Sequence, residues 1–160
     1  MNLYHGSLEI VEKPIIMQSV RTLDYGTGFY TTTSYEQAEQ WTRRRMEGNA
    51  SIGYVNCYQL NTDVLPLMHV LWFDEPTTEW VDFVMANRTQ EDFAHSYDLV
   101  YGPVANDRVY AAFALYEGGL IEKEGLIREL KTYRLIVQML FHTDVALEHL
   151  VYIESKNITL

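Results

Sequence analysis

Hydrophobic and polar residues alternate with a period of two in several short segments, which is typical of half-buried β-strands. The clearest case is residues 52–60, where Val55 and Cys57 share one face. Residues 135–141 are almost wholly apolar and are interrupted only by Gln138, so they predict a buried strand. Further strands are expected at residues 2–4, 28–32, 97–101 and 151–153.

Helical spacing and helix-end signals separate these strands. The sequence Ser34-Tyr35-Glu36-Gln37 matches a capping box, in which the Ser34 hydroxyl accepts from the backbone amide of Gln37. Because Gly48 then supplies a stop, we expect a helix over residues 35–47. Apolar residues at i, i+3 and i+4 predict a second helix over residues 80–88. Further helices are expected over residues 109–116 and 122–131, and in a short segment capped by Thr143.

Short strands interspersed with helices favour a mixed α+β fold over a doubly wound one. Nothing divides the sequence: no internal repeat, low-complexity tract or Gly/Ser/Pro-rich linker occurs, and the four prolines are scattered. A chain of 160 residues is close to the usual size of one domain and buries roughly 70% of its unfolded surface. We therefore expect one domain over residues 1–160.

The charge balance restricts the classes of partner. The formal net charge is −10 at pH 7, so the mean field of the protein repels phosphate backbones and anionic lipids. A basic run at residues 43–45 is the one candidate nucleic-acid patch, although arginines late in a helix also complement its dipole. A single cysteine excludes an internal disulfide, and no apolar run approaches the roughly 18 residues of a membrane span. These features predict a cytoplasmic protein without a membrane partner.

The first candidate functional segment is His5-Gly6-Ser7, which follows the opening strand. An imidazole at a strand end can hydrogen-bond a ribose hydroxyl, and the following glycine lets a ligand approach the backbone closely. An ordinary surface or core histidine would give the same pattern.

The second segment is Gly26-Thr27-Gly28-Phe29-Tyr30-Thr31-Thr32. Its tyrosine could stack on a flat heteroaromatic ring, and the threonine hydroxyls could bind a ribose or an amide. Its glycine spacing fits neither a Walker nor a dinucleotide-binding loop. An edge strand after a tight turn is the alternative interpretation.

Together, the two segments resemble the ADP-ribosyltransferase superfamily, in the group whose site triad is His, Tyr, and Glu or a substitute. A narrower resemblance, to an uncharacterised bacterial family placed in that superfamily, covers nearly the whole chain. It is carried by residues 3–7 (LYHGS), 28–30 (GFY), 37–38 (QA), 97–100 (YDLV), 102–105 (GPVA) and 138–143 (QMLFHT). The resemblance implies a split β-sheet core of short strands with flanking helices.

The resemblance also implies roles for individual residues. His5 corresponds to the histidine that holds the adenosine-side ribose of NAD, and Tyr30 to the tyrosine that packs on nicotinamide. Hydroxyls that line the nicotinamide pocket correspond to Thr31 and Thr32. The NAD-binding residues expected on this basis are His5, Gly6, Ser7, Gly28, Tyr30, Thr31 and Thr32.

The third position of the triad is usually a glutamate on a late strand, and its best match here is Gln138. A carboxamide can hydrogen-bond a ribose hydroxyl, but it carries no negative charge and cannot act as a base. A buried glutamine bonded to neighbouring backbone would have the same sequence signature.

If Gln138 is the third residue, a separate acid could complete the site. Asp107 is the first choice because it follows an expected turn at Gly102. Asp98 and Asp82 are alternatives. Each also has a structural interpretation: Asp107 could cap a helix, Asp98 could pair with Arg88, and Asp82 could be a solvated flank.

The resemblance therefore implies an NAD-dependent ADP-ribosyltransferase with NAD as co-substrate and a protein or nucleic acid as acceptor. A bacterial toxin or phage-defence effector would have this activity, and an antitoxin or regulatory protein would be its partner. The alternatives are an NAD glycohydrolase and an inactive module that binds NAD or ADP-ribose. No metal is expected, because the five histidines show no close ligand spacing.

Overall fold

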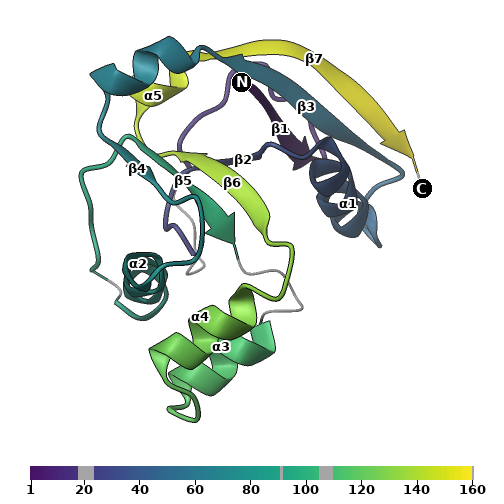
Figure 1. The fold of residues 1–160 in the computed structure, drawn as a ribbon. Helices are drawn as coiled ribbons and strands as arrows, with labels where there is room; N and C mark the ends of the chain where they lie inside the picture. The colour runs from purple at the N-terminus through teal and green to yellow at the C-terminus, as the bar shows by residue number, and fades with distance from the viewer. Residues whose placement is uncertain (18–23, 91, 105–109, 160) are drawn as a thin grey trace.

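The computed structural model describes residues 1–17, 24–90, 92–104 and 110–159. Within these residues the strands form one mixed, open sheet of seven strands in the order β4-β5-β6-β2-β1-β3-β7 (Figure 1). The strands are β1 (Asn2–Ser7), β2 (Phe29–Thr32), β3 (Ile52–Leu60), β4 (Val70–Trp72), β5 (Leu99–Val104), β6 (Ile136–Phe141) and β7 (Leu150–Thr159). β4 and β5 pair in parallel, and the other neighbouring strands are antiparallel. The expected α+β class is confirmed.

The two predicted helix N-caps, Ser34 and Thr143, are both present. Ser34 accepts from the backbone amide of Gln37 at 3.3 Å, as expected, and the helix it caps ends just before Gly48, whose φ is +72°. Thr143 likewise accepts from the Ala146 amide at 3.2 Å. The helices are α1 (Tyr35–Met46), α2 (Thr78–Thr89), α3 (Tyr110–Glu117), α4 (Lys123–Leu130) and α5 (Asp144–Leu147), with a 3₁₀ helix, η1 (Thr62–Leu67).

Several strand boundaries differ from the prediction. β1 continues through Ser7, so that His5 lies inside the strand and not at its end. β5 runs through Gly102 and Pro103, where a turn was expected. The short β4 pairs only with β5 residues up to Tyr101, so Pro103 occupies a stretch whose β4 side has no strand partner and where its missing N–H costs no ladder bond. β4, η1 and the second half of β7 were not predicted.

The sheet narrows to a weak join between β1 and β2. β1 pairs with β3 along its whole length but with β2 at a single registered pair, Tyr4 and Thr32. The sheet therefore consists of two groups, β4-β5-β6-β2 and β1-β3-β7, joined at a place that we call the β1–β2 seam. Figure 1 shows α1 below β1 and β3, and α2, α3 and α4 gathered around the other group.

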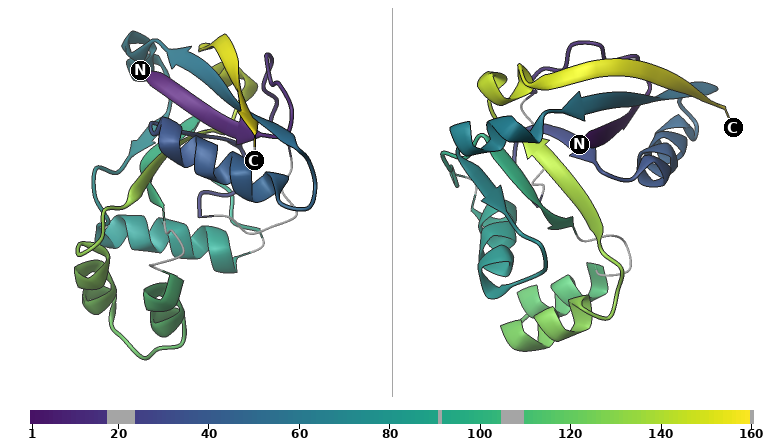
Figure 2. Two further views of the ribbon diagram at one scale, coloured as in Figure 1. Left: turned by 90° about the vertical axis from the view of Figure 1, so that its right-hand side faces the viewer. Right: turned by 45° about the horizontal axis from the view of Figure 1, so that its top comes forward.

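Three clusters of buried side chains hold these groups together. The largest lies between α2, α3, α4 and the β5–β6 strands, around Trp80 and Phe113. A second joins both strand groups through residues such as Leu3 and Phe141, and a third packs α1 on β3. The views of Figure 2 show α1 and the α3–α4 pair as separate helical groups. Within the described ranges, no helix is long and apolar enough to cross a membrane.

Candidate functional site at the seam

Register across the seam places three side chains on one face of the sheet. Gln138 of β6 is paired with Thr32 of β2, and Thr32 is paired with Tyr4 of β1. Directly paired residues point to the same side of a sheet. This side is the one that carries α1, because the Thr32 hydroxyl donates to Gln37 of α1 at 3.0 Å. The strands that carry His5, Tyr30 and Gln138 are therefore immediate neighbours, and Tyr30 faces the same side as Gln138. His5 follows Tyr4 along β1, so its side chain leaves from the opposite side of the sheet, where it packs on Phe29.

His5 bridges the seam through its ring. Its Nδ1 lies 2.7 Å from the carbonyl oxygen of Tyr30, and its ring packs on Phe29 with 4.5 Å between centroids. A carbonyl only accepts, so Nδ1 carries the proton, and a neutral ring then presents a lone pair on Nε2. Burial lowers the pKa of His5, and the positive charge of Arg45 lowers it further, against the opposing effect of the Tyr30 bond. The geometry therefore makes Nε2 a hydrogen-bond acceptor at neutral pH.

Tyr30 is half-buried, and its hydroxyl donates to the Gly26 carbonyl at 2.6 Å. This bond holds the turn before β2, where Gly26 has a φ of +76°. Burial raises the pKa of the Tyr30 phenol well above its ordinary value, so the group stays protonated. The phenol anchors the turn and the ring borders the largest core cluster, which leaves only part of the ring for a ligand.

Gln138 lies in the middle of β6 with Thr32 on one side and Gly102 on the other. Its side chain is half-buried, and no hydrogen bond from it to another described residue is present. The alternative of a buried glutamine bonded to neighbouring backbone therefore does not describe this side chain. Its carboxamide retains donors and an acceptor for a ligand.

The threonine hydroxyls of β2 are committed to the sheet. Thr31 is buried and donates to the carbonyl of Met139 at 2.7 Å. Thr32 lies 2.9 Å from the carbonyl of Val137, accepts from the Ser34 amide, and is also buried. Both residues fix β2 against β6, so any contact with a ligand would require them to share these hydroxyls.

Two of the candidate glycines are required by packing. A Cβ on Gly6 would lie 2.3 Å from the carbonyl oxygen of Ala38 and 2.6 Å from the Thr42 hydroxyl. A Cβ on Gly28 would lie 2.8 Å from the carbonyl oxygen of Phe141. Real Cβ atoms do not approach so closely. Gly6 thus lets α1 pack on β1, and the space over its Cα belongs to that helix and not to a ligand.

Ser7 belongs to a buried polar network. Its hydroxyl donates to the Glu9 carbonyl and accepts from Nδ2 of Asn56 at 3.0 Å. Asn56 is completely buried and also bonds the carbonyl of His5 and the amide of Val11. The network holds the chain that leaves β1, which is a structural use of the Ser7 hydroxyl.

The three candidate acids differ in what the structure shows of them. Asp107 lies outside the described residues. Asp98 accepts from the His69 amide at 3.0 Å and the Thr143 hydroxyl at 2.8 Å, and these bonds help to lower its pKa. Asp82 pairs with Lys123 of α4.

The expected pairing of Asp98 with Arg88 is wrong. Arg88 bonds Asp24 at 2.7 Å and Glu117 at 3.2 Å instead.

The sequence alone did not identify one flank of α1. Gln37, Trp41 and Arg45 are spaced i, i+4 and i+8, so they share one side of the helix. Gln37 contacts Thr32 at one end of this stripe, and the charge of Arg45 acts on His5 at the other. Trp41 lies between them and is 51% exposed. Helical spacing from the capping box could have found this stripe, whereas the basic run alone indicated a nucleic-acid patch or a contact with the helix dipole.

Among the described residues, no group of three or more His, Cys, Asp or Glu side chains could hold a metal ion. A pocket of about 380 Å³ lies on the β1-β3-β7 group beside Tyr35, and neither His5, Tyr30 nor Gln138 lines it. The pocket therefore borders the seam through Tyr4 but contains none of the three candidate site residues.

Comparison with known proteins gives one match. The model of a family described as Protein of unknown function (DUF3990) matches residues 1–152. No curated protein and no solved structure matches the chain.

Proposed function

Because the chain belongs to this DUF3990 family, whose description assigns no function, we propose from the site itself that the protein is an NAD-dependent ADP-ribosyltransferase. One observation carries the proposal. β2, with Tyr30, lies directly between β1, with His5, and β6, with Gln138. Three residues far apart in the sequence, which the resemblance to ADP-ribosyltransferases groups as one triad, thus come from adjacent strands at the seam.

The seam offers suitable contacts for NAD. Nε2 of His5 would accept a hydrogen bond from a hydroxyl of the adenosine-side ribose. Arg45 supplies an exposed positive charge near His5, which suits the pyrophosphate. The exposed part of Tyr30 and the indole of Trp41 offer apolar surface for a flat ring.

The proposed reaction breaks the bond between C1′ of the ribose and the nicotinamide nitrogen, whose positive charge is neutralised by the departing electron pair. A nucleophile on the acceptor forms the new bond to C1′ and releases its proton. Gln138 would hold a ribose hydroxyl as the C1′ centre gains oxocarbenium character. A carboxamide cannot take the acceptor's proton, so that proton must go to another acid or to solvent.

The neutral side chain of Gln138 favours a second candidate, a module that binds NAD or ADP-ribose without turnover. Hydrolysis, in which water replaces the acceptor, uses the same contacts as transfer. A toxin or phage-defence effector in the cytoplasm, controlled by an antitoxin or another protein, would be the setting for the transferase.

The test uses NAD labelled in its ADP-ribose part, purified protein and a cell lysate. Label on protein or nucleic acid supports transfer, soluble ADP-ribose supports hydrolysis, and intact but bound NAD supports the binding module.

His5→Asn is the informative binding variant, because its amide can still donate to the Tyr30 carbonyl but offers nothing in place of Nε2. We expect NAD binding to be lost while the melting temperature stays close to that of the wild type. His69→Asn, at an exposed histidine, is the matched control. NAD affinity that is unchanged in His5→Asn would refute the assignment of the seam.

Gln138→Glu tests the third position. A carboxylate facing the nicotinamide ribose should raise the rate of NAD cleavage by about tenfold or more. Gln59→Glu makes the same change at an exposed residue of β3. A folded Gln138→Glu variant with no gain in cleavage would show that this side chain does not face the reacting ribose.

A further inference from the structure

The pocket beside Tyr35 is the strongest feature that the proposed function does not use. It measures about 380 Å³ and lies on the face of the β1-β3-β7 group that carries α1. α1 covers one end of this face, where it packs over Gly6 and Gly53. The other end, beyond the first turn of the helix, is open and forms the pocket. Its volume is within the range of about 300–1,000 Å³ found for small-molecule sites.

A β-bulge shapes the floor. Tyr58 pairs with Tyr152 and Cys57 pairs with Glu154, so Ile153 is an extra residue in β7 with no partner in β3. Bulges of this kind redirect a side chain and are common beside binding sites. Ile153 lines the pocket and is 55% exposed, although it is a large apolar residue. Together with the thiol of Cys57 it gives the pocket an apolar floor.

Two tyrosines form an aromatic wall. The rings of Tyr4 and Tyr35 meet edge to face with centroids 5.5 Å apart. Nζ of Lys156 lies 5.4 Å from the centroid of the Tyr35 ring. A flat ligand can therefore pack against ring edges and faces that are already fixed in place.

The rim carries an acceptor and a donor side by side. Oε1 of Glu154 and Nζ of Lys156 are 3.3 Å apart, and both side chains are about half exposed. A carboxylate accepts from an amino group, and an ammonium donates to a ring nitrogen or a carbonyl oxygen. Adenine, guanine and cytosine present such neighbouring donors and acceptors on one edge.

We propose that this pocket binds the base of a free nucleoside or mononucleotide that carries an exocyclic amino group. The base lies against Tyr4 and Tyr35, as bases stack on aromatic side chains in many proteins. Glu154 takes the amino group, and Lys156 donates to the neighbouring ring atom. The net charge of −10 disfavours a polynucleotide as the source of the base. The pocket contains none of His5, Tyr30 and Gln138, so this proposal does not depend on NAD turnover.

Cys57 provides a direct readout, because it is the single cysteine of the chain and lines the pocket. Burial raises the pKa of its thiol, so alkylation is slow and is best followed in mildly alkaline buffer. Adenosine and cytidine at saturating concentration should slow the alkylation of Cys57 at least threefold, and uridine should protect less. Saturation-transfer NMR gives the affinity of each nucleoside independently.

Two variants test the named contacts. Tyr35→Ala should weaken adenosine binding at least fivefold, in line with the loss of one stacking contact. Glu154→Gln should remove the preference for adenosine and cytidine over uridine. Glu148→Gln, at an exposed glutamate outside the pocket, should change neither the affinity for adenosine nor the preference over uridine.

Three outcomes would overturn the proposal. The first is the absence of saturation transfer from any nucleoside to the wild-type protein. The second is binding that leaves the alkylation rate of Cys57 unchanged, which would place the ligand elsewhere. The third is a single-stranded oligonucleotide that protects Cys57 more strongly than free nucleosides do. NAD turnover is measured on the same variants, so that a failure of the nucleoside-pocket proposal can be told apart from a failure of the proposed NAD site at the seam.

Discussion

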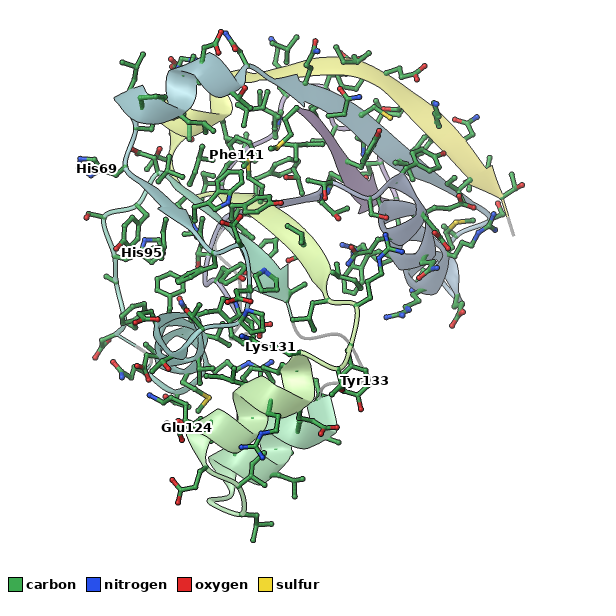
Figure 3. The ribbon with its side chains drawn as sticks, viewed as in Figure 1. His69, His95, Glu124, Lys131, Tyr133 and Phe141 are labelled. Atoms are coloured by element: carbon green, nitrogen blue, oxygen red, sulfur yellow. The ribbon has the colours of Figure 1, made fainter. Side chains whose placement is uncertain are left out.

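Protonation of His142 should destabilise the fold in a defined pH range. Its Nδ1 lies 2.6 Å from the carbonyl oxygen of Thr27, so Nδ1 carries the proton and Nε2 a lone pair. Nε2 is buried and has no hydrogen-bond partner among the described residues, and the His95 ring stands perpendicular to the His142 ring at 4.5 Å. Figure 3 shows His95 near α2, whose Phe83 it contacts, whereas His69 lies at the periphery. A second proton, on Nε2, would make the ring positively charged and would have no hydrogen-bond acceptor among the described residues.

Burial is the main cause that lowers the pKa of His142 from 6.5 to about 4. The folded state therefore binds this proton less readily than the unfolded state. The contribution of neutral His142 to the free energy of unfolding is fully present above pH 6.5 and is lost as the pH falls from 6.5 towards 4. The shift corresponds to roughly 3 kcal/mol in total, of which about 2.5 kcal/mol is lost by pH 4.5.

The assay is urea unfolding at pH 7 and pH 4.5 of the wild type and of His142→Asn, whose amide can still donate to the Thr27 carbonyl. We expect the difference in free energy of unfolding between the two proteins to shift by about 2 kcal/mol in favour of the variant on acidification. His69→Asn is the exposed control and should show no such shift. If the difference between wild type and His142→Asn is the same at both pH values, His142 is not held neutral in the fold.

Two further predictions concern packing and the buried polar network, and both are checked by chemical denaturation. Gly6→Ala should destabilise the protein by about 2–3 kcal/mol, because the new methyl group meets the Ala38 backbone. Gly125→Ala in α4, where the nearest atom is 3.7 Å away, should instead stabilise it by about 1 kcal/mol, and similar effects at both glycines would contradict the packing role of Gly6. Asn56→Leu should cost about 3 kcal/mol, since it removes the bonds that the fully buried amide makes with the Val11 amide and with the Ser7 and Ser155 hydroxyls, and a loss below 1 kcal/mol would mean that water replaces the amide.

Local sequence patterns predicted the elements whose signals are local. The strand at Ile52–Leu60 has the predicted bounds, and the capping box at Ser34 starts α1 as expected. These succeed because alternation and capping depend on residues within one turn or one strand. The sequence also contained the candidate segments around His5 and Tyr30, because each of them is short and continuous.

Long-range contacts explain the differences. Pro103 stays in β5 because β4 is too short to pair with it, and its carbonyl accepts from the Trp80 indole at 2.9 Å. The sequence allowed the Thr31 hydroxyl to face a ligand, but in the structure this hydroxyl donates to the Met139 carbonyl of the neighbouring strand β6. A single sequence does not show which strand lies next to which, so it cannot show which polar groups are already bonded.

The sequence by itself determined the α+β class, the main helices and strands, and the segments that contain His5, Tyr30 and Gln138. Only the tertiary structure decided that their strands are neighbours, that the Nδ1 bond of His5 leaves Nε2 as an acceptor, and that Gly6 serves the packing of α1. The physical reason is that hydrophobic periodicity and caps act over a few residues. Strand order, burial and the direction of a hydrogen bond depend on residues up to 100 positions or more apart, as in the bond from Thr31 to Met139 with a separation of 108.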